Sequence, residues 1–373
     1  MMAKQQIARF PFKNSTPGST GVEMEWITVD AADGSQIPVA PELLKKIGKT
    51  ERIKQELFTS TIEVNTEIHF DTQSCIDELS RLRLDVLDKL EPMGGALLSS
   101  GTHPFSRWRD QKVSDDPRYY NLLERLQWMA YRFNIFGIHV HIGMPDGNTC
   151  IHVMNQLLPI SPFFLAISAN SPFWQGDDTG LSSTRVKIFE GLSQGGMPFY
   201  FQDWLDFEHC ADRLLATGSI DSVRDIWWEM RPHPDFGTLE VRIGDMPATK
   251  EDTAAYIAYV RAETMAAINS EPSKKVHPSL IRENRWRACR YGVKAEIIDP
   301  VTEEPLPLLL CLTKRLDHLA KQGADHDDLE LLRSRIEHWR KAGDGSRRQR
   351  NLLQQISDFK QVVKTMRETD GWS

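Results

Sequence analysis

Four short segments place acidic or imidazole residues at every second position, with apolar residues between them. They are Gly21–Trp26, Ile62–Ile68, Ile138–Ile142 and Thr238–Ile243. Successive side chains of a β-strand point to opposite faces of the sheet, so each segment predicts a strand with one apolar and one polar face. The chain must therefore bury the apolar faces of four such strands.

The polar faces of these strands have an unusual composition. Each is made from a subset of Glu23, Glu25, Glu63, Asn65, Glu67, His139, His141, Glu240 and Arg242. Any one of them has the pattern of an ordinary half-exposed strand. A solvated face usually carries Lys and Thr, whereas these faces contain no Lys. Taken together, the four strands predict one shared acidic site.

Carboxylates that converge on one face repel each other unless cations lie among them. A donor set of many oxygens and at most two nitrogens favours Mg²⁺ or Mn²⁺ over Zn²⁺. These ions commonly bridge phosphates, which points to phosphoryl transfer from a nucleotide. Arg242 could then neutralise the transferred phosphoryl group. For His139 and His141, metal ligation and structural hydrogen bonding are both open.

The rest of the chain alternates helical and strand patterns. Apolar spacing predicts a helix over residues 76–90 that follows a Ser74 cap, and further helices near 119–133, 149–169 and 251–269. Three helical segments are expected within residues 306–367. We expect a flexible lead-in over residues 1–19 and a single domain over 20–373 with a helical last third.

Composition and missing motifs exclude several classes of protein. A net charge of -7 argues against nucleic-acid binding. Five cysteines without a CxxC pair suit a reducing compartment, so a cytoplasmic protein is expected. Neither a signal sequence nor a membrane span is expected. HExxH, Walker A, GxGxxG and GxSxG motifs are all absent from the sequence.

The motifs around these strands resemble those of the carboxylate-amine ligases of the glutamate-cysteine ligase 2 family. The segments that carry the resemblance begin at Gly21 (GVEMEW), Gly101 (GTHPF), Gly137 (GIHVHIG), Ser168 (SANSPFWQGDDTGL), Arg231 (RPHPDFGTLEVRIGD) and Gly343 (GDGSRRQR). The resemblance implies an α+β fold with a curved, mainly antiparallel sheet backed by helices, as in glutamine synthetase. It also implies ATP, Mg²⁺ (or Mn²⁺) and amino acid substrates, by family name glutamate and cysteine, joined through an acyl phosphate. A homodimer is suggested by analogy.

The same resemblance implies roles for individual residues. The expected metal ligands are Glu23, Glu25, Glu63, His139 and Glu240. Arg242 and Arg185 are expected at phosphate or at the substrate carboxylate, His141, His103 and Arg231 at substrate, and Arg285 and Arg290 at nucleotide. Glu56 could be a further ligand, but its offset of seven from Glu63 puts it on the opposite face of a straight strand unless a bulge or turn intervenes.

Alternatives remain at three of these places. The arginines near Trp286 could pack on a helix, and His103 could belong to a structural turn. The basic stretch Ser346–Arg350 could meet phosphate or could be a solvated helix start. Two rival functions are a divalent-metal hydrolase and a nucleotide-binding protein with little turnover.

Overall fold

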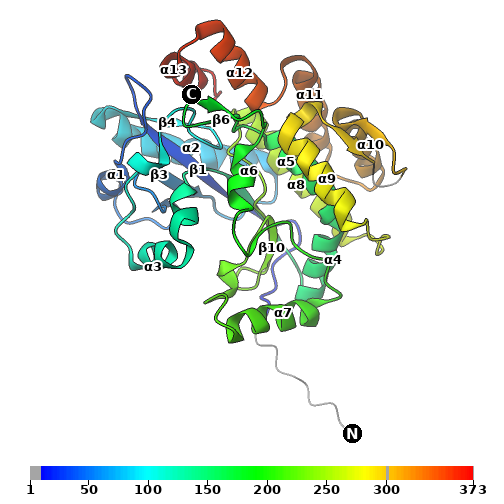
Figure 1. The fold of residues 1–373 in the computed structure, drawn as a ribbon. Coiled ribbons are helices and arrows are strands. Elements are labelled where there is room, and N and C mark those ends of the chain that lie inside the picture. The colour runs from blue at the N-terminus through cyan, green and yellow to red at the C-terminus, as the bar shows by residue number, and fades with distance from the viewer. Residues whose placement is uncertain (1–9, 300–301, 373) are drawn as a thin grey trace.

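The computed structural model describes residues 10–299 and 302–372. Its centre is a seven-stranded antiparallel sheet with the strand order β10-β11-β5-β1-β3-β2, and β4 also pairs with β1 (Figure 1). The strands are β1 (Thr20–Asp30), β2 (Ile53–Gln55), β3 (Thr61–Asn65), β4 (Gly95–Leu98), β5 (Ile138–Gly143), β10 (Met230–His233) and β11 (Thr238–Val241). The four segments predicted as strands all lie in this one sheet.

One face of the sheet is covered by helices. Val22, Met24 and Trp26 of β1 point to this side and are at most 1% exposed. The helices α2 (Thr72–Leu90), α4 (Gly147–Leu157) and α8 (Lys250–Ile268) pack against the sheet and against each other. Burying this apolar face leaves Glu23 and Glu25, which alternate with it, on the opposite side.

The start of α2 corrects one prediction. The helix is capped by Asp71, whose side chain accepts a hydrogen bond from the Ser74 backbone N–H at 2.7 Å. Ser74 therefore lies within the first turn instead of capping it. Both residues are good caps, and with Asp71 as the cap the Thr72 hydroxyl in the first turn donates to the buried Asp328 carboxylate at 2.5 Å.

The remaining elements surround this core. The other helices are α1 (Ala40–Ile47), α3 (Pro117–Leu126), α5 (Ser161–Ser168), α6 (Thr184–Phe189), α7 (Trp204–Ala216) and α9 (Pro278–Tyr291). Three small two-stranded sheets pair β6 (Phe173–Trp174) with β7 (Asp177–Asp178), β8 (Gly195–Gly196) with β9 (Trp227–Trp228), and β12 (Glu296–Ile298) with β13 (Pro305–Pro307). In Figure 1, α5 and α9 lie beside α8, away from β1.

The last third of the described chain is helical, as predicted, but it holds four helices where three segments were expected. They are α10 (Leu308–Lys321), α11 (His326–Ala342), α12 (Gly345–Ile356) and α13 (Phe359–Glu368). The extra break falls at Ser357, which has a left-handed φ of 57°, followed by Asp358 as the cap of α13. A single left-handed serine has no clear signature in the apolar spacing.

Two further expectations concern the ends and the membrane. From Phe10 onward the lead-in lies along the sheet, where the Lys13 and Ser15 N–H groups donate to Pro234 and Met144 carbonyls. Residues 1–9 lie outside the described residues. The stretch Gly147–Ser168 is long and apolar enough to cross a membrane by composition, but 78% of its most apolar window is buried inside the protein, as expected for core helices.

Candidate active site

The strand register brings the polar faces together. Glu25 of β1 lies opposite Glu63 of β3, and Glu23 lies opposite His139 of β5. On the other side of β5, His141 lies opposite Glu240 of β11. Directly paired residues of antiparallel strands have neighbouring side chains on one face. The predicted convergence of the four strands on one site is thus present in the described sheet.

The first acidic group consists of Glu25, Glu56 and Glu63. One carboxylate oxygen from each lies within 4.8 Å of the others, and all three side chains are half-buried. Burial, reinforced by the Glu63 carboxylate and opposed by Arg185, raises the pKa of Glu25 to about 7. Burial and Glu63 also raise the pKa of Glu56 well above its ordinary value. Three carboxylates this close destabilise each other when no cation lies between them.

Glu56 reaches this group through a hairpin. It follows β2 directly, and the chain turns over residues 57–60 before β3 returns alongside. Glu56 and Glu63 do not lie on one straight strand. Glu56 directly follows β2, whereas Glu63 lies in β3, the strand that pairs with it. The turn that the sequence argument required is present, and it is held by the Ser114 hydroxyl donating to the Glu56 carbonyl at 2.5 Å.

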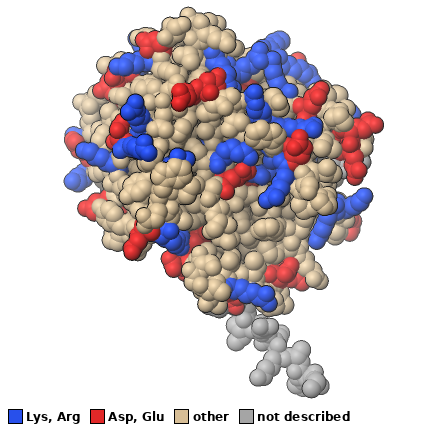
Figure 2. All heavy atoms as spheres, viewed as in Figure 1, with Lys and Arg blue, Asp and Glu red and all other residues tan. Residues whose placement is uncertain are grey.

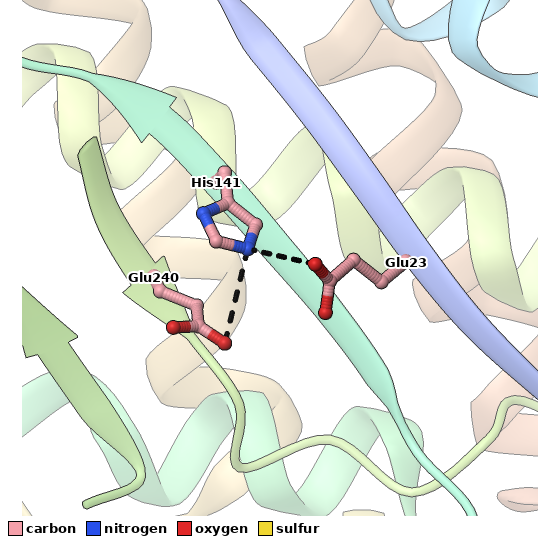
Figure 3. A group of neighbouring side chains, drawn as sticks. All are labelled: Glu23, His141 and Glu240. Carbon is pink, nitrogen blue, oxygen red and sulfur yellow. Dashed lines mark ion pairs between the residues drawn. The ribbon is translucent and has the colours of Figure 1, made fainter. Parts of the chain in front are cut away.

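The second acidic group consists of Glu23, His141 and Glu240, one from each of three adjacent strands (Figure 3). The Nε2 atom of His141 is 3.5 Å from Glu23 Oε1 and 3.8 Å from Glu240 Oε1. Nδ1 of His141 lies 3.0 Å from the Thr238 hydroxyl, which orients the ring so that Nε2 faces the carboxylates. Although burial opposes protonation, Glu240 and Glu23 raise the pKa of this imidazole above its ordinary value.

His139 lies next to the same carboxylates. Its Nδ1 is 3.0 Å from Glu23 Oε2 and 3.9 Å from Glu240 Oε1. Burial and the Arg242 guanidinium lower the pKa of His139 to about 4, so the ring is neutral at pH 7 and one of its nitrogens can accept. Both imidazoles therefore lie within 4 Å of the Glu23 and Glu240 carboxylates.

Two arginines balance the charge of the second acidic group. Glu240 is 1% exposed and accepts from Arg231 Nε at 2.7 Å and from Arg242. Burial disfavours its ionisation, but the two guanidiniums outweigh burial and hold the pKa of Glu240 well below its ordinary value. Bonds from His139 and His141 lower the pKa of Glu23 in the same way. The Nε of Arg242 is buried with no hydrogen-bond partner among the described residues.

Arg185 lies behind the first acidic group. It is 3% exposed and donates to the backbone carbonyls of Arg242 and Ile243, each at 3.2 Å. A Cβ on Gly137 would lie 2.2 Å from its guanidinium, so glycine is required for this approach. The charge of Arg185 is felt by Glu25. In this position the side chain fixes the backbone that carries Arg242.

His103 has a contact network of its own. Its Nε2 is 2.8 Å from the Gly34 carbonyl, and its Nδ1 accepts from the backbone N–H groups of Phe105 and Ser106. Gly34 follows the far end of β1, beyond Asp30. The described contacts therefore connect His103 to a turn and do not bring it to either acidic group.

Arg285 and Arg290 are also occupied by protein partners. Arg285 is 5% exposed and forms ion pairs with Glu190, at 2.5 Å, and with Glu229. Arg290 donates to the Gly180 carbonyl and lies over the ring of Tyr291. These contacts occupy both guanidiniums with protein groups, so the predicted role of Arg285 and Arg290 in nucleotide binding stays a prediction.

The basic stretch after Ser346 forms the start of α12. Arg348 pairs with the buried Asp252, and Arg350 pairs with Asp178 at 2.6 Å. These contacts fasten α12 to the start of α8 and to the β6–β7 ribbon. The expected helix start is present, and Arg348 and Arg350 are occupied by carboxylates, whereas Arg347 is exposed.

The sequence argument did not identify the residues on the turn between β10 and β11. His233 and Phe236 have stacked rings with centroids 4.0 Å apart, and each ring is 5.8 Å from that of His141. Burial lowers the pKa of His233 to about 4. The only available signal was their place in RPHPDFG, immediately before the strand that carries Glu240.

The donor sets fit divalent cations. The first acidic group offers three carboxylates, which is the hard oxygen set that Mg²⁺ and Mn²⁺ bind. The second adds imidazole nitrogen to two carboxylates. On the face of the molecule drawn in Figure 2, acidic and basic side chains are interspersed.

Comparison with known proteins agrees with this geometry. The model of the glutamate-cysteine ligase family 2 (GCS2) matches residues 19–369. A protein of Gloeobacter violaceus named "Putative glutamate--cysteine ligase 2" is 41% identical over 363 residues, which cover 95% of this chain and 97% of that protein. A protein of Solibacter usitatus with the same name is 36% identical over 361 residues, covering 94% and 92%.

Two solved structures share the fold. The glutamate–cysteine ligase of Francisella tularensis, in complex with AMP, has a TM-score of 0.71 at 13% identity and covers 96% of this chain and 89% of its own. The bifunctional glutathione synthetase of Pasteurella multocida has a TM-score of 0.74 at 14% identity, covering 94% of this chain and 52% of its own. The expected mainly antiparallel sheet backed by helices, of the glutamine synthetase type, is confirmed.

Proposed function

The chain belongs to the glutamate-cysteine ligase family 2, a family of ATP-dependent ligases that form amides, and we propose that it joins two amino acids through an acyl phosphate. Glutamate as the carboxylate and cysteine as the amine are the pair that the relatives' names suggest. One observation carries the proposal. Two acidic groups lie side by side on one sheet face, with the guanidinium of Arg242 close to both.

The reaction needs charge stabilisation more than covalent help from the protein. An oxygen of the substrate carboxylate attacks the γ-phosphorus of ATP, and ADP leaves with the electrons of the broken P–O bond. The amine nitrogen then attacks the acyl carbon, phosphate leaves with the C–O electrons, and the nitrogen loses a proton. Negative charge accumulates on the transferred phosphoryl group in the first step.

Arg242 is suited to that charge. Its pKa is raised because Glu240, Glu23 and Glu25 outweigh the effect of burial, so the guanidinium stays charged and faces carboxylates of both groups. The buried Nε–H group of Arg242 has no hydrogen-bond acceptor among the described residues. Preorganised donors of this kind stabilise a transition state without reorganisation. Arg185 would act through Arg242, by bonding the backbone carbonyls of Arg242 and Ile243 just after the end of β11.

We assign divalent cations to the two acidic groups. Glu25, Glu56 and Glu63 would hold one, and Glu23 and Glu240 with the imidazoles of His139 and His141 would hold another. Bound there, Mg²⁺ would supply charge neutralisation for the phosphates of ATP. Arg242, which pairs with Glu240, would bind and orient the phosphates beside this cation.

Hydroxylamine provides the sharpest test, because it replaces the amine and converts an activated carboxylate into a stable hydroxamate. The purified chain is incubated with ATP, Mg²⁺ and each common amino acid, with and without hydroxylamine. We expect Mg²⁺-dependent ADP release stimulated by one carboxylate, most strongly glutamate, and hydroxamate in equal amount. ADP without hydroxamate for any amino acid would contradict an acyl phosphate. No stimulated ADP release at all would contradict the ligase assignment.

A further inference from the structure

One fully buried carboxylate, that of Asp245, belongs to neither acidic group. Its Oδ2 atom accepts hydrogen bonds from the Ser171 hydroxyl at 2.6 Å and from the Asn170 N–H at 2.9 Å. Its Oδ1 atom accepts one from the Ser183 hydroxyl at 2.7 Å. All three donors are uncharged, whereas buried carboxylates are usually paired with cations. The segments that carry these donors therefore indicate what Asp245 holds in place.

Two of the donors lie at the start of α6. Ser183 caps this helix, and its hydroxyl accepts from the Val186 N–H at 3.4 Å. The Ser171 hydroxyl accepts from the Arg185 N–H at 3.1 Å. Each hydroxyl thus donates to Asp245 and accepts from the first turn of α6. Through the two serines, one carboxylate fixes the backbone that carries Arg185.

Arg185 continues the chain of contacts to the site. Its guanidinium donates to the Arg242 and Ile243 carbonyls, just after the end of β11. It also lies against Gly137, which forms an antiparallel bridge with Asp245. Burial raises the pKa of Asp245, and the charge of Arg185 opposes that rise. The guanidinium is therefore held between the Asp245 region and the backbone of Arg242.

The other side of Asp245 is fixed to the C-terminal helices. The Asn170 amide donates to the Met246 carbonyl at 2.9 Å and accepts from Gln349 of α12 at 2.7 Å. A Cβ on Gly101 would lie 2.8 Å from Asp245 Cγ, so a glycine is required beside the carboxylate. Asp245, Asn170, Gly101 and Gln349 come from four different segments of those that carry the family resemblance. Support of this kind preorganises the groups that it holds.

We propose that Asp245 is a positioning residue for phosphoryl transfer, which fixes the start of α6 and so holds Arg185 against the backbone of Arg242. The inference rests on the proposed function, because Arg242 is the group assigned to the transferred phosphoryl charge. A misplacement of about 1 Å by a change far from the chemistry costs roughly 100-fold in rate. An interaction made only in the transition state is lost from kcat and not from KM.

The first test is Asp245→Asn, which keeps the size of the side chain and removes its charge. We expect kcat for ADP formation to fall about 10- to 100-fold, while the KM for ATP changes less than about threefold. Asp328→Asn is the matched control, for which kcat should not change. Asp328 is also buried, accepts from the Thr72 hydroxyl at 2.5 Å and lies 3.4 Å from Arg261, outside both acidic groups.

A double variant tests whether Asp245 acts through Arg185. In a chain that carries Arg185→Ala, Asp245→Asn should lower kcat no further, because both changes remove the same link. Ser183→Ala removes one donor and keeps the carboxylate, so it should lower kcat in the same direction but less. It also provides the measurement if Asp245→Asn does not fold.

Hydrogen exchange gives a readout that needs no turnover. The Arg242 N–H donates to the Glu229 carbonyl at 2.7 Å, and this bond should open more often when Arg185 is held less firmly. Peptides that cover residues 238–244 should therefore exchange faster in Asp245→Asn and Ser183→Ala than in the unmodified chain. Exchange there should be unchanged in Asp328→Asn.

The other outcomes overturn the inference. An unchanged kcat in both Asp245→Asn and Ser183→Ala would show that the carboxylate only maintains the fold. Losses that multiply in the double variant would show that Asp245 acts independently of Arg185. An equal loss of kcat in Asp328→Asn would indicate a general effect of buried carboxylates. If the unmodified chain forms no ADP, the proposed function fails, and exchange alone then decides whether Asp245 holds the end of β11.

Discussion

The two acidic groups lie on the same face of one sheet, yet their charges are balanced in opposite ways. In the second group, two arginines and two imidazoles surround Glu23 and Glu240, and the pKa of each carboxylate is lowered. In the first group, carboxylates face carboxylates, and the pKa values of Glu25 and Glu56 are raised. The protein's own cationic side chains neutralise the negative charge of the second group, whereas the charge of the first group needs a bound cation. The first group should therefore depend more on metal, and the second should contribute more to stability.

The largest expected effect is on activity, from Glu25→Gln. Removing one carboxylate from the first acidic group should lower kcat for ADP formation at least about 100-fold, because even partners of metal ligands are worth 10- to 100-fold. The metal-free variant should unfold at the same or a higher denaturant concentration, since a like-charge repulsion is lost. Denaturant unfolding in chelator measures this. A destabilised variant would mean that Glu25 is structural.

Glu240→Gln should show the reverse balance. It breaks a buried ion pair with Arg231 and Arg242, so we expect a loss of about 3 kcal/mol in the free energy of unfolding. Activity should fall as well, but the free energy of unfolding is the quantity that should distinguish Glu240→Gln from Glu25→Gln. Equal stability of the two variants would remove the distinction between the groups.

Asp252, which belongs to neither acidic group, tests whether a buried carboxylate paired with arginines contributes to stability. Burial opposes its ionisation, but Arg348 and Arg335 outweigh burial and lower the pKa of Asp252 to about 2. A lowered folded-state pKa means that its stabilisation is full above the unfolded value near 3.8 and is lost as pH falls toward 2. Asp252→Asn should cost about 3 kcal/mol at pH 7. The difference from the unmodified chain should shrink below pH 4, and a constant difference in unfolding experiments would contradict the ion-pair explanation.

The smallest effect is expected from Arg290→Ala. Its guanidinium bonds the Gly180 carbonyl and lies over Tyr291, away from both acidic groups. The Kd for Mg²⁺-bound ATP should stay within about twofold, because the described contacts of Arg290 are with Gly180 and Tyr291 and not with either acidic group. A tenfold weaker Kd would restore the sequence-based expectation that Arg290 binds nucleotide.

These comparisons also show which features the sequence could predict. The strand period identified Glu23, Glu25, Glu63, His139 and Glu240 as members of one face, because alternation along a strand is local and survives folding. The family resemblance is confirmed over residues 19–369. Both predictions rest on short segments of sequence, each of which can be recognised without knowing its contacts in the fold.

The features that the sequence did not predict depend on distant contacts or on turns. The sequence showed that Glu56 needed a bulge or turn to join Glu63, but the hairpin that brings them together was not predicted. Arg285 has partners 56 and 95 residues away in the chain, Glu229 and Glu190, which no local pattern indicates. Phe236 lies in a turn, where neither helix nor strand period applies. Turn geometry and long-range ion pairs were therefore the missing information.

The most direct test of a metal-dependent first acidic group uses Glu56, which the structure brings within reach of Glu25 and Glu63. Mn²⁺ binding is measured by calorimetry for the unmodified chain, Glu56→Gln and Glu67→Gln. Glu67 is the matched control, because it is an exposed carboxylate just after β3, the partner strand of β2, and pairs with Arg52. We predict that Glu56→Gln weakens tight Mn²⁺ binding at least about tenfold while Glu67→Gln leaves it unchanged. Equal Mn²⁺ affinity in all three proteins would contradict the account.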